Sequence, residues 1–96
     1  MALLLTMPCD HTTRFDAPTW VEPAPGAKDV CQDCHAAGES VWAHLRMCLT
    51  CGHVACCDSS PHRHASAHQR ASTHPVMRSF EPGETWRWCY VDRRIV

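Results

Sequence analysis

The chain has few large aliphatic side chains and little net charge. Leu, Ile, Val and Phe supply 15 of its 96 residues, below the roughly 20% under which a highly charged chain usually stays disordered. The formal net charge is only −1, so disorder is not favoured either. The sequence therefore excludes a large enzyme core and predicts one small domain over residues 1–96, stabilised by disulfides or by metal.

Long apolar runs are also missing. The run at the start of the chain, Ala2–Leu5, has four apolar residues and no basic residue before it. A signal peptide needs about 7–15 apolar residues and a membrane helix needs about 20. We therefore expect a cytoplasmic protein without a membrane segment, in a compartment where thiols stay reduced.

Cysteine and histidine are abundant, with 8 of each. An even number of cysteines would suggest a disulfide framework in a short secreted chain. A disulfide framework does not account for so many histidines, whereas zinc sites combine thiolate and imidazole ligands. The composition therefore favours bound metal over disulfides.

Local patterns predict a small α+β domain, with a twisted antiparallel sheet, one main helix and long loops. The helix is expected over about residues 61–73. Ser60 is a suitable N-cap before Pro61, good helix formers follow, and Pro75 ends the pattern. Short strands are expected within 41–47, 53–57, 76–80 and 85–91, the last two joined by a Pro-Gly turn, and a proline-containing loop is expected over 12–30.

Two Cys-x2-Cys pairs are the strongest metal signal. In the simplest assignment, a zinc ribbon, both pairs bind one ion, with Cys31, Cys34, Cys48 and Cys51 as its ligands. The ribbon leaves other cysteines and three closely placed histidines unexplained. Of these, His64 and His68 lie four residues apart and so share one face of the predicted helix.

Signals of catalysis are absent. A zinc-protease helix needs a glutamate directly after its first histidine, but Ala65 follows His64. The chain has no glycine-rich phosphate loop, and no Ser-His-Asp arrangement stands out. We therefore expect a protein that is not an enzyme.

The order of these residues resembles the UBP-type zinc finger, the ubiquitin-tail-binding finger of ubiquitin hydrolases and of one cytoplasmic histone deacetylase. The resemblance covers roughly residues 9–92, which indicates a stand-alone, single-domain form. It rests on both Cys-x2-Cys pairs, Trp42, Cys56, the His64–His68 pair, His74 and the segment Trp88–Tyr90.

The resemblance implies an interleaved ligand assignment. The first zinc takes Cys31, Cys34, Cys56 and His64, and the second takes Cys48, Cys51, His68 and His74. Relatives with a third zinc use an N-terminal Cys-x-His and a C-terminal Cys-x2-Cys. Here the corresponding set is Cys9, His11, Cys89 and Asp92, and an aspartate oxygen is an acceptable zinc ligand.

We therefore expect three zinc ions, and at least two, in closed sites that stabilise the fold. Cys57 is left without a role as a ligand, and His53 is a less favoured substitute ligand. His35, His44 and His62 are expected to be exposed.

The resemblance also implies a pocket for a free Gly-Gly carboxylate tail, in which aromatic rings enclose the glycines and an arginine binds the carboxylate. The candidate partner-binding residues here are Trp42, Arg46, Arg87, Trp88 and Tyr90. Asp58 stands where the family has its arginine and would repel an anionic tail. We therefore expect a protein or peptide tail as the partner, with ubiquitin disfavoured; core packing is the alternative role for Trp42 and Trp88.

Two other functions are alternatives. The first is a nucleic-acid-binding zinc protein that uses the arginines of residues 63–94, although the near-neutral net charge does not favour it. The second is a thiol and zinc redox sensor in which Cys57 is the available thiol.

Overall fold

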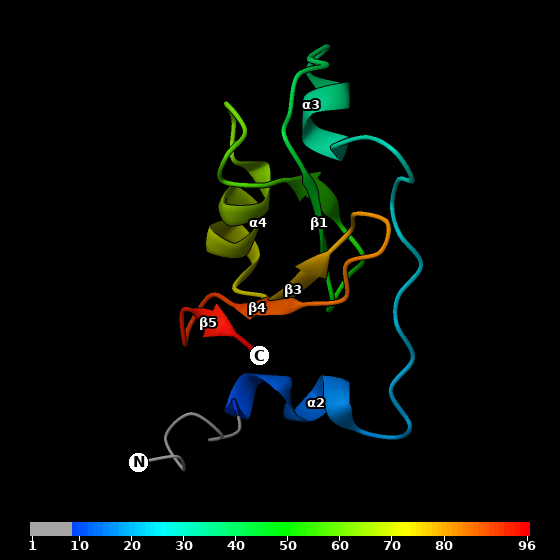
Figure 1. The fold of residues 1–96 in the computed structure, drawn as a ribbon, viewed down its shortest axis with the longest axis vertical. Helices are drawn as coiled ribbons and strands as arrows, with labels where there is room; N and C mark the ends of the chain where they lie inside the picture. The colour runs from blue at the N-terminus through cyan, green and yellow to red at the C-terminus, as the bar shows by residue number, and fades with distance from the viewer. Residues whose placement is uncertain (1–8) are drawn as a thin grey trace.

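A computed structural model describes residues 9–96, and the Ala2–Leu5 run lies outside that range. Its centre is a five-stranded antiparallel sheet in the order β2-β1-β3-β4-β5 (Figure 1). The strands are β1 (Leu45–Cys48), β2 (Val54–Cys56), β3 (Val76–Ser79), β4 (Arg87–Cys89) and β5 (Arg94–Ile95). Four short helical elements of residues 9–96 accompany the sheet, and the predicted α+β class is confirmed.

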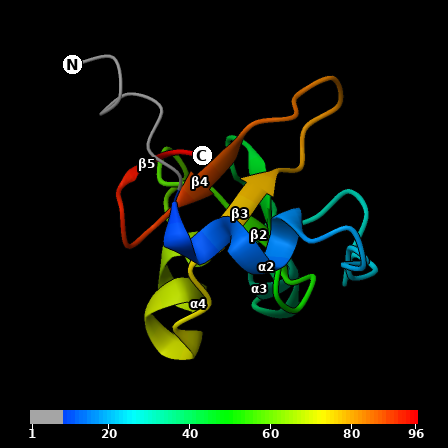
Figure 2. The same cartoon turned by 90° about the horizontal axis from the view of Figure 1, so that it is seen from below.

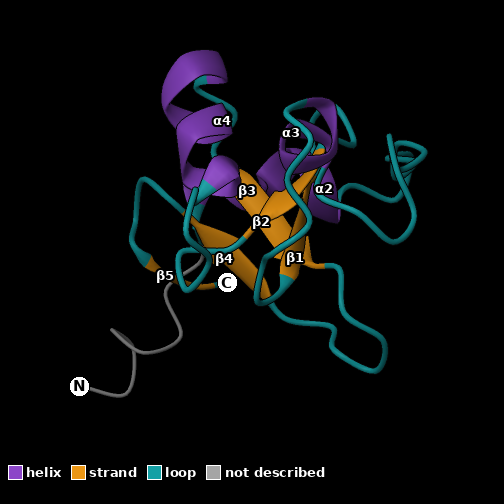
Figure 3. Cartoon of the chain, turned by 90° about the horizontal axis from the view of Figure 1, so that it is seen from above, coloured by secondary structure: helices purple, strands orange, loops and turns teal. Residues whose placement is uncertain are grey.

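The helices lie on different sides of the sheet. They are η1 (Asp10–Thr12), α2 (Thr13–Asp16), α3 (Gln32–Ala36) and α4 (His64–Ser72). Seen from below, α2 crosses in front of β3 and β4 (Figure 2). Seen from above, α3 and α4 lie at one end of the sheet, where both contact β2 (Figure 3). No helix in residues 9–96 has the length and apolar character of a membrane span.

The main helix begins later than predicted. Its first residue is His64, and Arg63 precedes it in the left-handed region with a φ of 49°. Ser60 does not cap the helix, because its hydroxyl accepts the backbone N–H of Ala43 at 2.8 Å. The N–H of His64 instead donates to Cys56 Sγ at 3.3 Å. A sulfur atom therefore accepts one of the free N–H groups at this helix start.

The strands also differ from the prediction in extent. Val41 and Trp42 lie before β1, which begins at Leu45, and β4 is shorter than the expected 85–91. The chain turns after Cys89, where the N–H of Arg93 donates to the Cys89 carbonyl, and returns as β5, which was not predicted. The hairpin of β3 with β4 is confirmed, with Val76 opposite Cys89.

The start of the expected 12–30 loop is helical. Phe15 on α2 is buried, and its ring packs edge-on against Trp20 with the ring centroids 5.4 Å apart. Asp16 forms an ion pair with Arg87 of β4 at 2.8 Å. The ion pair joins the N-terminal segment to β4, although the segment is too short to be a stable helix by itself.

The core contains little aliphatic material. Among residues 9–96, the buried Leu, Val and Phe side chains are Phe15, Leu45, Leu49, Val54 and Val76. Seven of the eight cysteines are buried, and the exposed one is Cys51. Much of the interior is therefore occupied by thiols that are candidate metal ligands.

Candidate metal centres and surface groove

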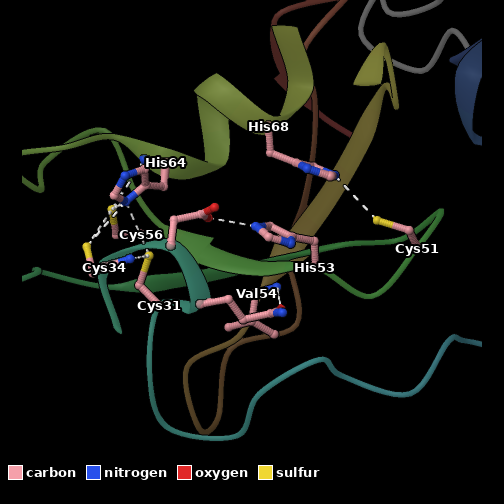
Figure 4. A network of polar contacts seen from close by, with 10 residues as sticks. Cys31, Cys34, Cys51, His53, Val54, Cys56, His64 and His68 are labelled. Carbon is pink, nitrogen blue, oxygen red and sulfur yellow. Dashed lines mark hydrogen bonds and ion pairs between the residues drawn. The ribbon is translucent and has the colours of Figure 1, made fainter. Parts of the chain in front are cut away.

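The first ligand cluster joins three segments that lie apart in the sequence. Cys31 precedes α3, Cys34 lies within it, Cys56 ends β2 and His64 begins α4. Figure 4 shows the three sulfurs gathered around the His64 ring, and His64 Nδ1 lies 3.4, 3.3 and 3.5 Å from the sulfurs of Cys31, Cys34 and Cys56. All three cysteines are fully buried.

These distances fit a tetrahedral zinc site. Zn–S bonds of about 2.3 Å and Zn–N bonds of about 2.0 Å place neighbouring S and N ligands about 3.5 Å apart, and two sulfurs about 3.8 Å apart. The sulfurs of Cys34 and Cys56 are 4.0 Å apart. Burial, together with the neighbouring Cys31 and Cys56 thiols, raises the pKa of the Cys34 thiol to about 12. A bound cation reverses this preference by stabilising the thiolates.

The second cluster lies at the other end of β2. Cys48 Sγ lies 3.4 Å from His74 Nδ1, and Cys51 Sγ lies 3.4 Å from His68 Nε2. All four ligand atoms lie within 4.8 Å of one another. Cys51 is exposed and the two histidines are half-buried, so this cluster is more open than the first.

The third cluster brings the N-terminal segment to the β4–β5 turn. Cys9, His11, Cys89 and Asp92 have ligand atoms within 4.8 Å of one another. His11 Nδ1 lies 3.7 Å from Cys9 Sγ and 3.3 Å from Asp92 Oδ1. Burial raises the pKa of the Cys9 thiol to about 11, helped by Asp92 and Cys89. The set holds two sulfurs, a nitrogen and an oxygen, all acceptable zinc ligands.

The structure does not form a zinc ribbon. The first Cys-x2-Cys pair meets Cys56 and His64, and the second meets His68 and His74, in two separate clusters. The two histidines of α4 share one helix face, as predicted, but one turn of helix carries them to different clusters. The interleaved sets implied by the resemblance are the ones that the fold brings together.

The remaining cysteine and histidines lie outside the clusters. Cys57 is buried, with its sulfur 3.6 Å from the Ser60 hydroxyl. His35, His44 and His62 are exposed, as expected. His53 joins no cluster, but it lies beside His68, with the two rings stacked.

A groove of about 660 Å³ lies on the sheet face next to α4. Arg46, Trp86, Trp88 and Tyr90 line it, with the Arg46 guanidinium 4.5 Å from the centre of the Trp86 ring. Asp58 also lines the groove and accepts a hydrogen bond from the Ser66 hydroxyl. Burial raises the pKa of Tyr90 to about 12, so its phenol remains neutral.

Two of the five predicted partner-binding residues lie elsewhere. Trp42 lines a separate depression with Leu45 and Phe80, because it lies before β1 rather than on the strand. Arg87 points to the opposite face of β4, where it pairs with Asp16. Arg46, Trp88 and Tyr90 are brought together as expected.

Trp86 is the groove residue that sequence reasoning missed. Trp86, Trp88 and Tyr90 are spaced by two residues, and side chains at that spacing share one face of a strand. The same alternation would have placed Arg87 on the other face.

The arginines do not form one basic patch. Arg78 pairs with Glu22 at 2.7 Å, Arg87 pairs with Asp16 at 2.8 Å, and Arg94 lies 3.8 Å from Asp92. Half of the six arginines considered for nucleic-acid binding therefore face acidic groups.

Comparison with known proteins shows the family to which this pattern of cysteines and histidines belongs. Residues 31–96 match the family described as the Zn-finger in ubiquitin-hydrolases and other protein. The chain belongs to the UBP-type zinc-finger family. Ubiquitin carboxyl-terminal hydrolase 44 of Ailuropoda melanoleuca is 41% identical over 61 residues, which are 64% of this chain and 8% of that hydrolase.

A solved structure extends the likeness to the N-terminal segment. The solution NMR structure of a protein from Rhodopseudomonas palustris matches with a TM-score of 0.77 and 43% sequence identity. The match covers 93% of this chain and 80% of the other. This UBP-type finger thus resembles a protein of similar length and a small part of a much longer hydrolase.

Proposed function

We propose that this UBP-type finger is a protein-interaction module, not an enzyme, whose fold is held by three zinc ions. The first two sites would use the interleaved cysteine and histidine sets, and the third would use Cys9, His11, Cys89 and Asp92. Each site has four protein ligands and so leaves no position for a catalytic water, which is typical of structural zinc. Bound zinc would supply the folding free energy that the small aliphatic core cannot.

The observation that supports partner binding is the row of three aromatic side chains that share one face of β4 and of the residues on either side of it. Trp86, Trp88 and Tyr90 are only half-buried, although they are the largest side chains on that face. Aromatic residues and arginine dominate the binding energy of protein interfaces. Arg46 lies over Trp86 and adds a cation to the same surface.

We expect the partner to be a protein tail or loop that lies along this groove. An extended segment fits a groove with aromatic rings at alternate positions, because its side chains also alternate. Asp58 lines the groove, and its negative charge disfavours the free carboxylate of a ubiquitin tail. We expect the protein to act in the cytoplasm.

Titration of 15N-labelled protein with short peptides tests this function. One peptide should end in a free Gly-Gly carboxylate and its matched control in a Gly-Gly amide, with intact ubiquitin as a third ligand. Shifts at the Trp86 and Trp88 indole N–H signals that are equal or larger for the amide would support an uncharged segment in the groove. Absence of shifts at both indoles with every peptide and with ubiquitin would remove tail binding.

A further inference from the structure

His53 lies between the first two ligand clusters without belonging to either. It directly follows the second Cys-x2-Cys pair and its glycine. Its ring stacks on that of His68, with centroids 4.4 Å apart and an angle of 10° between the planes. Figure 4 shows His53 between the His64 cluster and the pair formed by His68 and Cys51.

The edge of the His53 ring contacts the turn between Cys31 and Cys34 of the first cluster. His53 Nε2 lies 2.7 Å from Asp33 Oδ2, and Asp33 stands between the ligands Cys31 and Cys34. The neighbouring Gln32 accepts the backbone N–H of Val54 at 2.6 Å. Both middle residues of the first Cys-x2-Cys pair thus bind the segment that follows the second pair.

His68 lies on the open side of the second cluster, beside the exposed Cys51. Its Nε2 atom lies 3.4 Å from the sulfur of Cys51, the one exposed cysteine. The ring extends from α4 and meets His74 edge-on, with centroids 5.5 Å apart. An edge contact leaves the ring plane free to turn about the χ2 torsion, whereas a flat ring stacked against it fixes the plane.

We propose that His53 is a positioning residue for the second metal site. Asp33 holds the His53 ring, and that ring keeps the His68 imidazole in the plane that directs Nε2 toward Cys51. The turn of the first site thereby strengthens metal binding at the second. This inference rests on the zinc occupancy proposed above, and it concerns geometry and not a change of protonation.

Graded chelation of the zinc-loaded protein tests the inference. Native mass spectrometry counts the ions per chain as the concentration of EDTA rises, and 15N shifts of the His68 ring report whether Nε2 still binds metal. We expect His53→Ala to lose the ion at His68 at an EDTA concentration about tenfold lower than the wild type does, since partners of metal ligands typically contribute 10–100-fold to affinity. The ion bound by His64 should be retained as in the wild type.

Four further variants separate positioning from general destabilisation. His53→Phe keeps a flat ring but loses the bond to Asp33, so it should recover part of the lost chelator resistance. Asp33→Ala should weaken the ion at His68, although Asp33 touches none of that site's ligands, whereas Asp33→Asn should resemble the wild type because its amide oxygen accepts the same bond. His35→Ala, at an exposed histidine of α3, is the matched control and should change nothing.

Two results would overturn the inference. One is a chelation curve for His53→Ala that equals the wild type's, with unchanged His68 ring shifts. The other is equal loss of the ions at His64 and His68, which would indicate a weakened fold. A wild-type protein without zinc at His68 would instead overturn the metal assignment itself, and this result is read before any variant is compared.

Discussion

The backbone N–H of Asp92 donates to Cys89 Sγ at 3.3 Å, as the N–H of Cys34 donates to Cys31 Sγ at 3.4 Å. The same local turn therefore places an aspartate where the first cluster has a thiol. The turn carries the Asp92 carboxylate to His11, which arrives from the N-terminal segment. The structure thus supplies a fourth candidate ligand although the sequence lacks the cysteine.

Substitution of Asp92 tests this third site. We expect Asp92→Ala to bind one zinc fewer than the wild type, because three protein ligands hold zinc more weakly than four. Asp92→Cys should keep the full number, since a thiolate is the more usual ligand at a closed site. Native mass spectrometry of the three proteins gives the answer, and an unchanged count in Asp92→Ala would show that the aspartate is not a ligand.

Cys56, the last residue of β2, and Cys57, which directly follows it, provide a matched pair of substitutions for the first site. Cys56→Ser should unfold the protein or remove its first zinc, because Cys56 Sγ lies 3.5 Å from His64 Nδ1 and also accepts the N–H that begins α4. Cys57→Ser should retain every zinc, with a stability change of about 1–2 kcal/mol for a buried polar substitution. Thermal unfolding followed by circular dichroism compares the two, and the reverse order of stability would mean that Cys57 is the ligand.

The same pair of variants also bears on the redox alternative. Burial acts to raise the pKa of the Cys57 thiol, but the Ser60 hydroxyl, nearby backbone groups and the Arg46 charge outweigh burial and lower the pKa. The thiol is nevertheless buried, and oxidation requires access as well as thiolate character. We expect mild peroxide to release zinc equally from the wild type and from Cys57→Ser; slower release from Cys57→Ser would favour the sensor.

Chelation should unfold the whole domain. Structural zinc sites in small domains contribute on the order of 10–16 kcal/mol of binding free energy at neutral pH, more than the total stability of about 5–15 kcal/mol of a typical domain. We expect excess EDTA with a reductant to abolish the dispersed NMR spectrum, and added zinc to restore it. A folded spectrum in the metal-free protein would mean that the aliphatic core is sufficient alone.

The fold and the clusters were accessible from the sequence to different degrees. The spacing of the two Cys-x2-Cys pairs pointed to metal but predicted a zinc ribbon, and the three interleaved sets came from the resemblance to the UBP-type finger. Spacing alone could not give them, because each set combines residues that only the fold brings together. The first residue of α4 could not be predicted from the local sequence, because its N–H donates to the sulfur of Cys56 at the end of strand β2. The predicted place of Arg87 in the groove was wrong, because side chains alternate along β4 and Arg87 lies between Trp86 and Trp88 on the opposite face.

Partner binding has its own matched pair of tryptophans. Trp88→Ala should weaken binding of a groove ligand by about tenfold or more, since buried aromatic anchors typically contribute at least 1–2 kcal/mol. Trp42→Ala should leave binding unchanged, because Trp42 lines a separate depression. Co-purification with each variant, followed by titration of the captured partner, checks this, and equal losses would place the binding surface away from β4.

The ratio of zinc to protein chain tests the central claim most directly. Protein purified from zinc-supplied cells and freed of loosely bound metal should be measured by elemental analysis against its amino-acid content. The three clusters predict three zinc ions per folded chain. A ratio of one, as in a zinc ribbon, or of zero would contradict a fold held by interleaved zinc sites, and a ratio of two would remove the third site.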